Sequence, residues 1–188
     1  MAKQLAKYFI AVVPENRIQE EVTEIKHQLR DKFRLKYALK SPAHITLKMP
    51  FLWNEEKEDV LIHKLGEMLS GISPFGVKTK GFDAFGKRVL FVRIIKSEEL
   101  NRLQSQVSKF CRQVLNQVEE LSDRNYHAHM TVAFKDVKEK DFESYMAFVK
   151  QFDANYTLDV RQIGLLKKTQ GKWNLICQLP LLGLHTEK

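Results

Sequence analysis

The chain has 188 residues, of which 44% are hydrophobic and 29% charged, and its formal net charge is +8. A chain of this length can bury a full hydrophobic core as one compact unit, and no apolar run approaches the roughly 18 residues that a membrane span needs. Cys111 and Cys177 have neither the spacing of a metal site nor that of a disulfide framework. We therefore expect a reducing, cytoplasmic location and no membrane partner.

The apolar residues recur at spacings that predict alternating strands and helices. In chain order, the predicted elements are a strand at 9–13, a helix over 18–33, a strand at 43–51, a helix over 60–69 and a β-like stretch at 75–85. A second series follows, with a strand at 89–95, a helix over 100–118, a strand at 127–134, a helix over 142–152 and strands at about 156–166 and 173–181. Asn54 and Ser97 are suitable helix caps, and Gly71 is a suitable helix end.

The two series have the same order, which indicates an internal duplication. We place the repeat units at about 6–86 and 87–182, as two pseudo-symmetric lobes of a single compact domain over residues 1–188. Two copies related by an approximate two-fold axis would bring the strands at 43–51 and 127–134 together at the centre. A coincidental alternation of helices and strands is the other explanation, because the two halves have little sequence identity.

Two similar strings, His44-Ile45-Thr46-Leu47 and His129-Met130-Thr131-Val132, lie in equivalent strands of the two units. With six His and seven Thr in the chain, random placement gives roughly 0.2 His-x-Thr strings, so a pair is not expected by chance. Side chains alternate along a strand, so the histidine and threonine of each string share one face. Two such strands facing each other would place two imidazoles and two hydroxyls around one gap. The alternative is two half-buried strands that carry these residues without a function.

This set of side chains is suited to phosphodiester chemistry without a metal ion. One imidazole can accept a proton from the attacking water or hydroxyl, while the other donates a proton to the departing oxygen. The threonine hydroxyls can hold the non-bridging phosphate oxygens and orient the in-line path. We therefore predict that His44 and His129 are catalytic, that Thr46 and Thr131 bind the phosphate, and that no cofactor is needed.

The chain resembles the 2H phosphoesterases, the superfamily that includes the 2′–5′ RNA ligase-like proteins and the RNA 2′,3′-cyclic phosphodiesterases. The resemblance rests on residues 8–14, on residues 42–51 around the first string, and on the second string. It implies an α+β fold made by a bilobal duplication, with antiparallel β-sheets flanked by helices and a central cleft between the two His-x-Thr strands. The two histidines and two threonines would line that cleft.

The same resemblance implies a metal-independent enzyme that acts on a 2′,3′-cyclic phosphate or a 2′–5′ phosphodiester bond. The expected partner is an RNA end or a nucleotide that carries such a phosphate, and the expected form is a monomer. Cyclic phosphodiesterases of this superfamily often carry an arginine shortly after the second string, where this chain has Ala133, Phe134 and Lys135.

Two further residues are candidates for substrate binding. Lys48 continues the face of His44 and Thr46 if the strand alternates regularly, so it could reach a phosphate, and otherwise it is a surface lysine. His127 shares a face with His129, so it is either a third histidine of the cleft or a solvent-exposed residue at the strand end. Basic residues gathered at 32–40 would attract an anionic substrate to this region.

Two other function classes stay open on the sequence. His127 and His129 form a His-x-His string that could bind a metal ion, although no third ligand has the clear spacing of a metallohydrolase. A non-catalytic module that binds a nucleotide or an RNA end would keep the same cleft without turnover. Two intact histidines favour an enzyme, because binding alone does not require two proton carriers.

Overall fold

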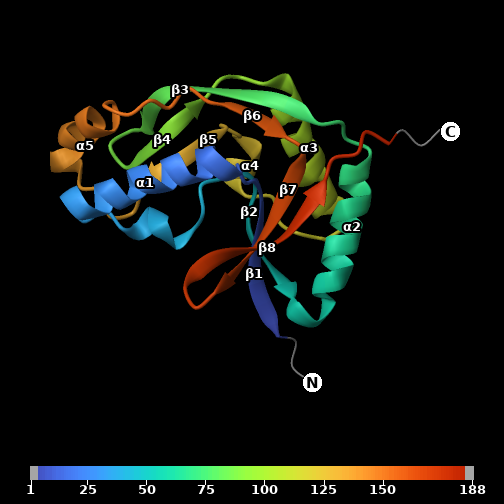
Figure 1. Ribbon diagram of the computed structural model, residues 1–188. Helices are drawn as coiled ribbons and strands as arrows, with labels where there is room; N and C mark the ends of the chain where they lie inside the picture. Colours follow the sequence, from blue (N-terminus) through green and yellow to red (C-terminus); the bar gives the residue numbers. More distant parts are fainter. Residues whose placement is uncertain (1–3, 185–188) are drawn as a thin grey trace.

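One antiparallel sheet runs through the molecule in the computed structural model, which describes residues 4–184 (Figure 1). Its eight strands lie in the order β6-β3-β4-β5-β2-β1-β7-β8. They are β1 (Leu5–Val12), β2 (Ile45–Asn54), β3 (Phe75–Phe85), β4 (Val89–Ile94), β5 (His129–Ala133), β6 (Thr157–Val160), β7 (Gln162–Thr169) and β8 (Lys172–Pro180). The predicted α+β class, with antiparallel strands flanked by helices, is confirmed.

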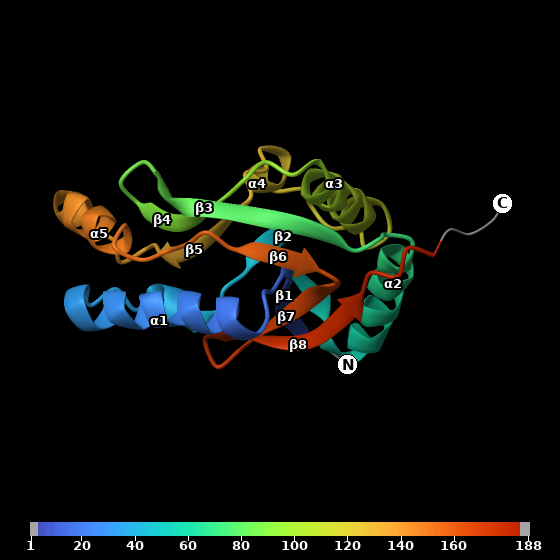
Figure 2. The same cartoon turned by 45° about the horizontal axis from the view of Figure 1, so that its top comes forward.

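The helices lie against this sheet and bury one of its faces. They are α1 (Asn16–Phe33), α2 (Glu58–Ser70), α3 (Glu98–Gln113), α4 (Leu121–Arg124) and α5 (Phe142–Val149), with short 3-10 turns η1 (Tyr37–Lys40), η2 (Glu55–Lys57) and η3 (Glu139–Asp141). Helix α1 packs on β5 and α3 packs on β2, while α5 lies beside α1 (Figure 2). The main hydrophobic core fills the space between the helices and the sheet.

Local sequence explains the two longest helices. Val22, Ile25 and Leu29 recur at spacings of three and four and are almost completely buried, so they form the apolar stripe of α1. The hydroxyl of Ser97 accepts a hydrogen bond from the Leu100 N–H (3.2 Å), which confirms Ser97 as the cap of α3. These two helices cross the middle of the sheet, so they support the strands that carry the two histidine strings.

The strands β2 and β5 are neighbours at the centre of the sheet, and we call their contact the central seam. It contains one paired position, Ile45 with Met130, and both side chains are fully buried. The two His-x-Thr strings therefore lie side by side in one sheet rather than on two strands that face each other across a gap. Helices α1 and α3 support this sparsely paired seam from the core side.

Several predicted boundaries differ in the structure. Helix α3 ends at Gln113, so Val118 lies beyond it and is 79% exposed. The strand predicted at 156–166 is divided between β6 and β7, and Asn54 caps the turn η2 instead of α2. Within residues 4–184, no helix combines the length and the apolar character that a membrane crossing requires. The repeat units, the monomeric state and the cytoplasmic location stay predictions.

Candidate active site

The central seam places all four string residues on the same face of the sheet, which we call the histidine face. Ile45 and Met130 point into the core, so the residues before and after them point the other way. If the register is continued by one residue, His44 lies opposite Thr131 and Thr46 lies opposite His129. Directly opposed residues have Cβ atoms about 4.5–5.5 Å apart. That continued register would bring each imidazole next to the hydroxyl of the other string.

Each histidine is held by the same kind of hydrogen bond. The Nδ1 atom of His44 lies 2.8 Å from the carbonyl oxygen of Pro42, and the Nδ1 atom of His129 lies 2.7 Å from the carbonyl oxygen of His127. A carbonyl oxygen can only accept a hydrogen bond, so Nδ1 carries the proton and Nε2 is the basic nitrogen of the neutral ring. The two rings thus have matching tautomers, each fixed by the backbone two residues earlier.

Aromatic rings flank both histidines. The Phe9 ring lies 4.8 Å from that of His44 and also 4.8 Å from that of Trp173. On the other side, Phe85 and Phe91 lie 4.8 Å and 5.2 Å from the His129 ring. These contacts remove much of each imidazole from water while leaving the side chain partly accessible.

Burial controls the protonation of both imidazoles. It lowers the pKa of His44 to about 4, with smaller lowering effects from Lys26 and His129, and the hydrogen bond to Pro42 opposes the shift. Burial also lowers the pKa of His129 below its usual range, and this is opposed by the bond to the His127 carbonyl. Both rings are therefore neutral in the free protein near pH 7. A bound phosphate anion would favour the protonated form of either ring.

The geometry agrees with what the chain is similar to. A family model described as the 2′-5′ RNA ligase superfamily matches residues 14–172. The chain belongs to this superfamily. A Bacillus subtilis protein named RNA 2′,3′-cyclic phosphodiesterase is 35% identical over 109 residues, which cover 56% of this chain and 58% of the relative. A Bacillus licheniformis protein provisionally named a phosphoesterase is 24% identical over 172 residues, covering 90% of this chain and 95% of that protein.

Solved structures confirm the superfamily fold. The Thermus thermophilus protein TT0787 aligns with a TM-score of 0.64 and 16% identity, over 95% of this chain and all of that one. Escherichia coli LigT complexed with 3′-AMP aligns with a TM-score of 0.61 and 16% identity, over 95% of this chain and 99% of LigT. At this level of identity the similarity supports the arrangement of helices and strands.

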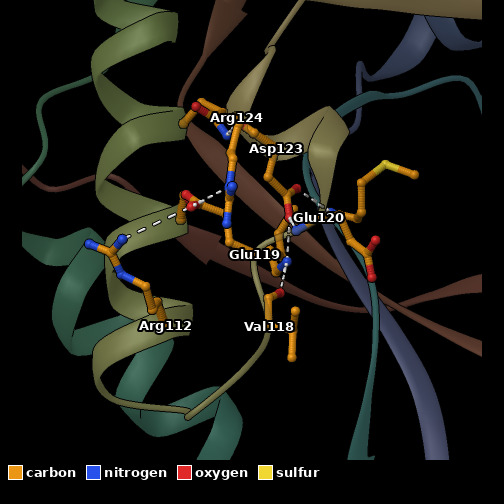
Figure 3. A network of polar contacts seen from close by, with 10 residues as sticks. Arg112, Val118, Glu119, Glu120, Asp123 and Arg124 are labelled. Carbon is orange, nitrogen blue, oxygen red and sulfur yellow. Dashed lines mark hydrogen bonds and ion pairs between the residues drawn. The ribbon is translucent and has the colours of Figure 1, made fainter.

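The structure contradicts the predicted substrate-binding role of Lys48. Lys48 is 2% exposed and forms a buried ion pair with Asp123, which is labelled in Figure 3. The reason is an irregularity in the β1–β2 pairing, where Ala11 pairs with Thr46 and the next residue back, Ile10, pairs with Lys48. The additional residue in β2 turns Lys48 to the core side of the sheet. Lys48 therefore cannot contact a phosphate on the histidine face.

His127 lies close to the second string, as its position in the sequence suggested. Its exposed ring is 5.1 Å from Phe85 and 6.0 Å from Phe91, the two rings that also contact His129. A substrate role for His127 stays a prediction. Across residues 4–184, no three His, Cys, Asp or Glu side chains come together in a group that could hold a metal ion. Within residues 4–184, the string of His127 and His129 therefore has no third metal ligand.

Several neighbours of the site were not predicted from the sequence. Phe9 belongs to the strand predicted at 9–13, and the structure places its ring against that of His44. It packs in a second small hydrophobic cluster with Ala11, Val13 and Leu166. Arg93 pairs with His129 across β4 and β5, and its Nε atom donates to the Lys80 carbonyl (3.2 Å). The uninterrupted apolar run at 9–13 could have indicated that both faces of this strand are covered by aromatic or apolar groups.

Proposed function

We propose that this protein is a metal-independent phosphoesterase that opens a 2′,3′-cyclic phosphate or a 2′–5′ phosphodiester of RNA or of a nucleotide. The observation that carries the proposal is the matched pair of Nδ1 hydrogen bonds, which leaves both Nε2 atoms free as proton carriers on one sheet face. Membership of the 2′-5′ RNA ligase superfamily and the named B. subtilis relative support the substrate class.

In the proposed reaction, one imidazole acts as general base and the other as general acid. The base accepts a proton at Nε2 from a water molecule, and the water oxygen forms a bond to phosphorus. The P–O bond to a ribose oxygen breaks, and that oxygen receives a proton from Nε2 of the second imidazole. A cyclic phosphate and water thus become a phosphomonoester and a free hydroxyl. In the reverse reaction, in which the ribose hydroxyl closes the cyclic phosphate and water leaves, the two rings exchange roles.

The threonines would act on the phosphate itself. Thr46 and Thr131 are partly exposed and lie next to the histidines on the same face. A hydroxyl can donate a hydrogen bond to a non-bridging oxygen, which holds phosphorus in line between the two imidazoles. Charge that develops on these oxygens in the transition state would strengthen the same hydrogen bonds.

Substitution of either histidine tests the proposal. His44→Ala and His129→Ala should each lower kcat on a hydrolysed substrate by about 10²–10⁴-fold, because each removes one proton-transfer role. The substrates to screen are 2′,3′-cyclic nucleotides, RNA ends with a cyclic phosphate, 2′–5′ oligonucleotides and ADP-ribose cyclic phosphate. Phosphorus NMR would show which ester bond opens and where the phosphate stays.

His63→Ala is the matched control, since His63 is an exposed histidine of α2 whose Nε2 atom lies 3.3 Å from Glu67 at the surface. This variant should keep full activity and the same circular dichroism spectrum. Full activity in His44→Ala or in His129→Ala would reject the assignment. Tight binding of a nucleotide with no turnover of any substrate would instead favour a non-catalytic binding module.

A further inference from the structure

Two lysine ammonium groups, those of Lys40 and Lys135, lie over the ring of Tyr37, and a third, that of Lys168, lies over the ring of Trp173. The ammonium groups of Lys40 and Lys135 lie 4.5 Å and 4.7 Å from the centre of the Tyr37 ring, and Lys135 also donates a hydrogen bond to its hydroxyl (3.1 Å). This hydrogen bond lowers the pKa of Tyr37, the charges of Lys135, Lys40 and, least, Lys168 act in the same direction, and burial opposes them. We call Tyr37 and these three lysines the tyrosine–lysine cluster.

The protein backbone holds this cluster in place. The Oδ2 atom of Asp136 accepts hydrogen bonds from the N–H groups of Lys36 (2.7 Å) and Tyr37 (2.8 Å), which ties η1 to the end of β5. The ring of Phe134 meets that of Tyr37 edge-on at 4.9 Å. Lys135 has a positive φ of 61°, a conformation that a non-glycine residue adopts at a cost. From this backbone conformation the exposed Lys135 side chain reaches the Tyr37 hydroxyl.

The cluster is continuous with the histidine face. From His44, ring contacts run to Phe9 and then to Trp173. The ammonium group of Lys168 lies 5.9 Å from the Trp173 ring, and Lys168 is also one of the charges that act on Tyr37. The buried Phe9 ring thus lies between His44 and Trp173, and the exposed Lys168 lies on the far side of Trp173.

The charges of this cluster lack an acidic counterpart within residues 4–184. Lys40, Lys135 and Lys168 are exposed, and none of them forms an ion pair with a carboxylate of that region. The one acidic side chain tied to the cluster, Asp136, uses its Oδ2 atom on backbone N–H groups. The like charges of Lys40 and Lys135 at one ring repel each other, and an anion placed between them would relieve this repulsion.

We propose that the tyrosine–lysine cluster binds a phosphodiester of the substrate other than the one that reacts, so the preferred substrate is an oligoribonucleotide and not a mononucleotide. Lysine ammonium groups suit a phosphate as point charges, and Tyr37 and Trp173 offer ring faces or edges to bases of a single strand. This inference rests on the proposed phosphoesterase function.

A double variant, Lys135→Met with Lys168→Met, tests the inference. Methionine keeps an apolar stem but removes the charge. We expect kcat/KM for an oligoribonucleotide that ends in a 2′,3′-cyclic phosphate to fall about tenfold or more, because charge-assisted contacts to phosphate are lost. The value for a 2′,3′-cyclic mononucleotide should stay near that of the unaltered protein. Lys109→Met together with Lys7→Met is the control, since both lysines are exposed on other elements and the net charge change is the same. An equal loss on both substrates, or a loss also in the control, would overturn the inference.

A binding measurement separates this inference from the proposed function. Fluorescence anisotropy of a labelled oligoribonucleotide with a 3′-phosphate is measured at several salt concentrations, and 3′-phosphorylated mononucleotide and inorganic phosphate serve as competitors. The double variant should bind the oligoribonucleotide more weakly, with a salt slope smaller by about 0.7 for each lost phosphate contact. This outcome would support the cluster even if no substrate were hydrolysed. Equal binding by both proteins, or competition by inorganic phosphate as strong as by an oligonucleotide, would count against it.

Discussion

At the scale of single residues, two backbone carbonyl groups determine the chemistry of the site. By accepting a hydrogen bond from Nδ1, the carbonyls of Pro42 and His127 make Nε2 the reactive nitrogen of each ring. Aromatic neighbours then remove water from the rings, which lowers the pKa of both histidines. In the proposed reaction the pair therefore has to share one proton, since a base and an acid are both required.

This arrangement predicts the pH dependence of kcat/KM. The pKa of His44 is lowered to about 4, and that of His129 lies below its usual value near 6.5. Above both pKa values, the fraction of protein with one protonated imidazole falls about tenfold for each pH unit. Below both, no neutral base is left. We expect a maximum at mildly acidic pH and a steady decline toward pH 9, measured with a cyclic nucleotide from pH 4 to 9. A rate that rises up to pH 9 would contradict these pKa directions.

Residue-level prediction from the sequence succeeded where strand alternation is regular. The two-residue period places His44 with Thr46 and His129 with Thr131, and the structure has all four on one face. The same rule failed at Lys48, because an extra residue in β2 reverses the alternation. Nothing in the local sequence marks that irregularity, which depends on the pairing with β1.

At the scale of elements, a buried polar network joins β2 to α4. The Asp123 carboxylate pairs with Lys48 and accepts hydrogen bonds from the N–H groups of Met49 (3.0 Å) and Glu120 (2.9 Å). Lys48 also donates to the Val118 carbonyl (2.9 Å), as seen around the labelled residues in Figure 3. The network fixes the short helix α4, which precedes the second histidine string by a few residues.

Removal of one partner from this network should destabilise the fold strongly. Lys48→Met leaves the Asp123 carboxylate buried without its counter-charge, so we expect the free energy of unfolding to fall by about 3–5 kcal/mol. Urea denaturation followed by circular dichroism measures the change. Lys7→Met, at an exposed lysine of β1, should alter stability by less than about 0.5 kcal/mol. A similarly small change in Lys48→Met would show that the ion pair does not matter for stability.

Element prediction was accurate where periodicity was long. The apolar stripes of α1 and α3 predicted both helices, and the capping residue Ser97 predicted the start of α3. By contrast, α4 has only four residues and η1 also has four, so neither is long enough to show a helical period. The division at Arg161 of the strand predicted at 156–166 was missed because β6 and β7 form one continuous apolar pattern that pairs with two different partners, β3 and β1.

At the scale of the whole molecule, the sheet order has a symmetric form. From the central seam outward, one side runs β5, β4, β3, β6 and the other runs β2, β1, β7, β8. In the predicted repeat units, 6–86 and 87–182, the strand β3 ends the first unit but pairs with β4 of the second, while β7 of the second pairs with β1 of the first. This order is consistent with a duplication. The sequence predicted the repeat, but the exchange of strands depends on long-range pairing that periodicity does not contain.

The distribution of metal-binding side chains leads to a prediction for the whole protein. No grouping of three or more His, Cys, Asp or Glu that could hold an ion occurs in residues 4–184. Incubation with EDTA, followed by its removal, should therefore leave kcat unchanged for any substrate that the protein hydrolyses. Magnesium or zinc added back should give no increase. Activity lost to EDTA and restored by a divalent ion would support the metallohydrolase alternative.

Because one residue pair joins β2 and β5, the distance between the two imidazoles depends on how the helices pack behind these strands. One bridged position alone does not lock two strands, and α1 and α3 hold them from the opposite side. Substitutions at Val22 or Leu103, both inaccessible to solvent, would change that packing and so the span across which a proton must be relayed. The proposed turnover would thus be tunable from positions that no substrate ever meets.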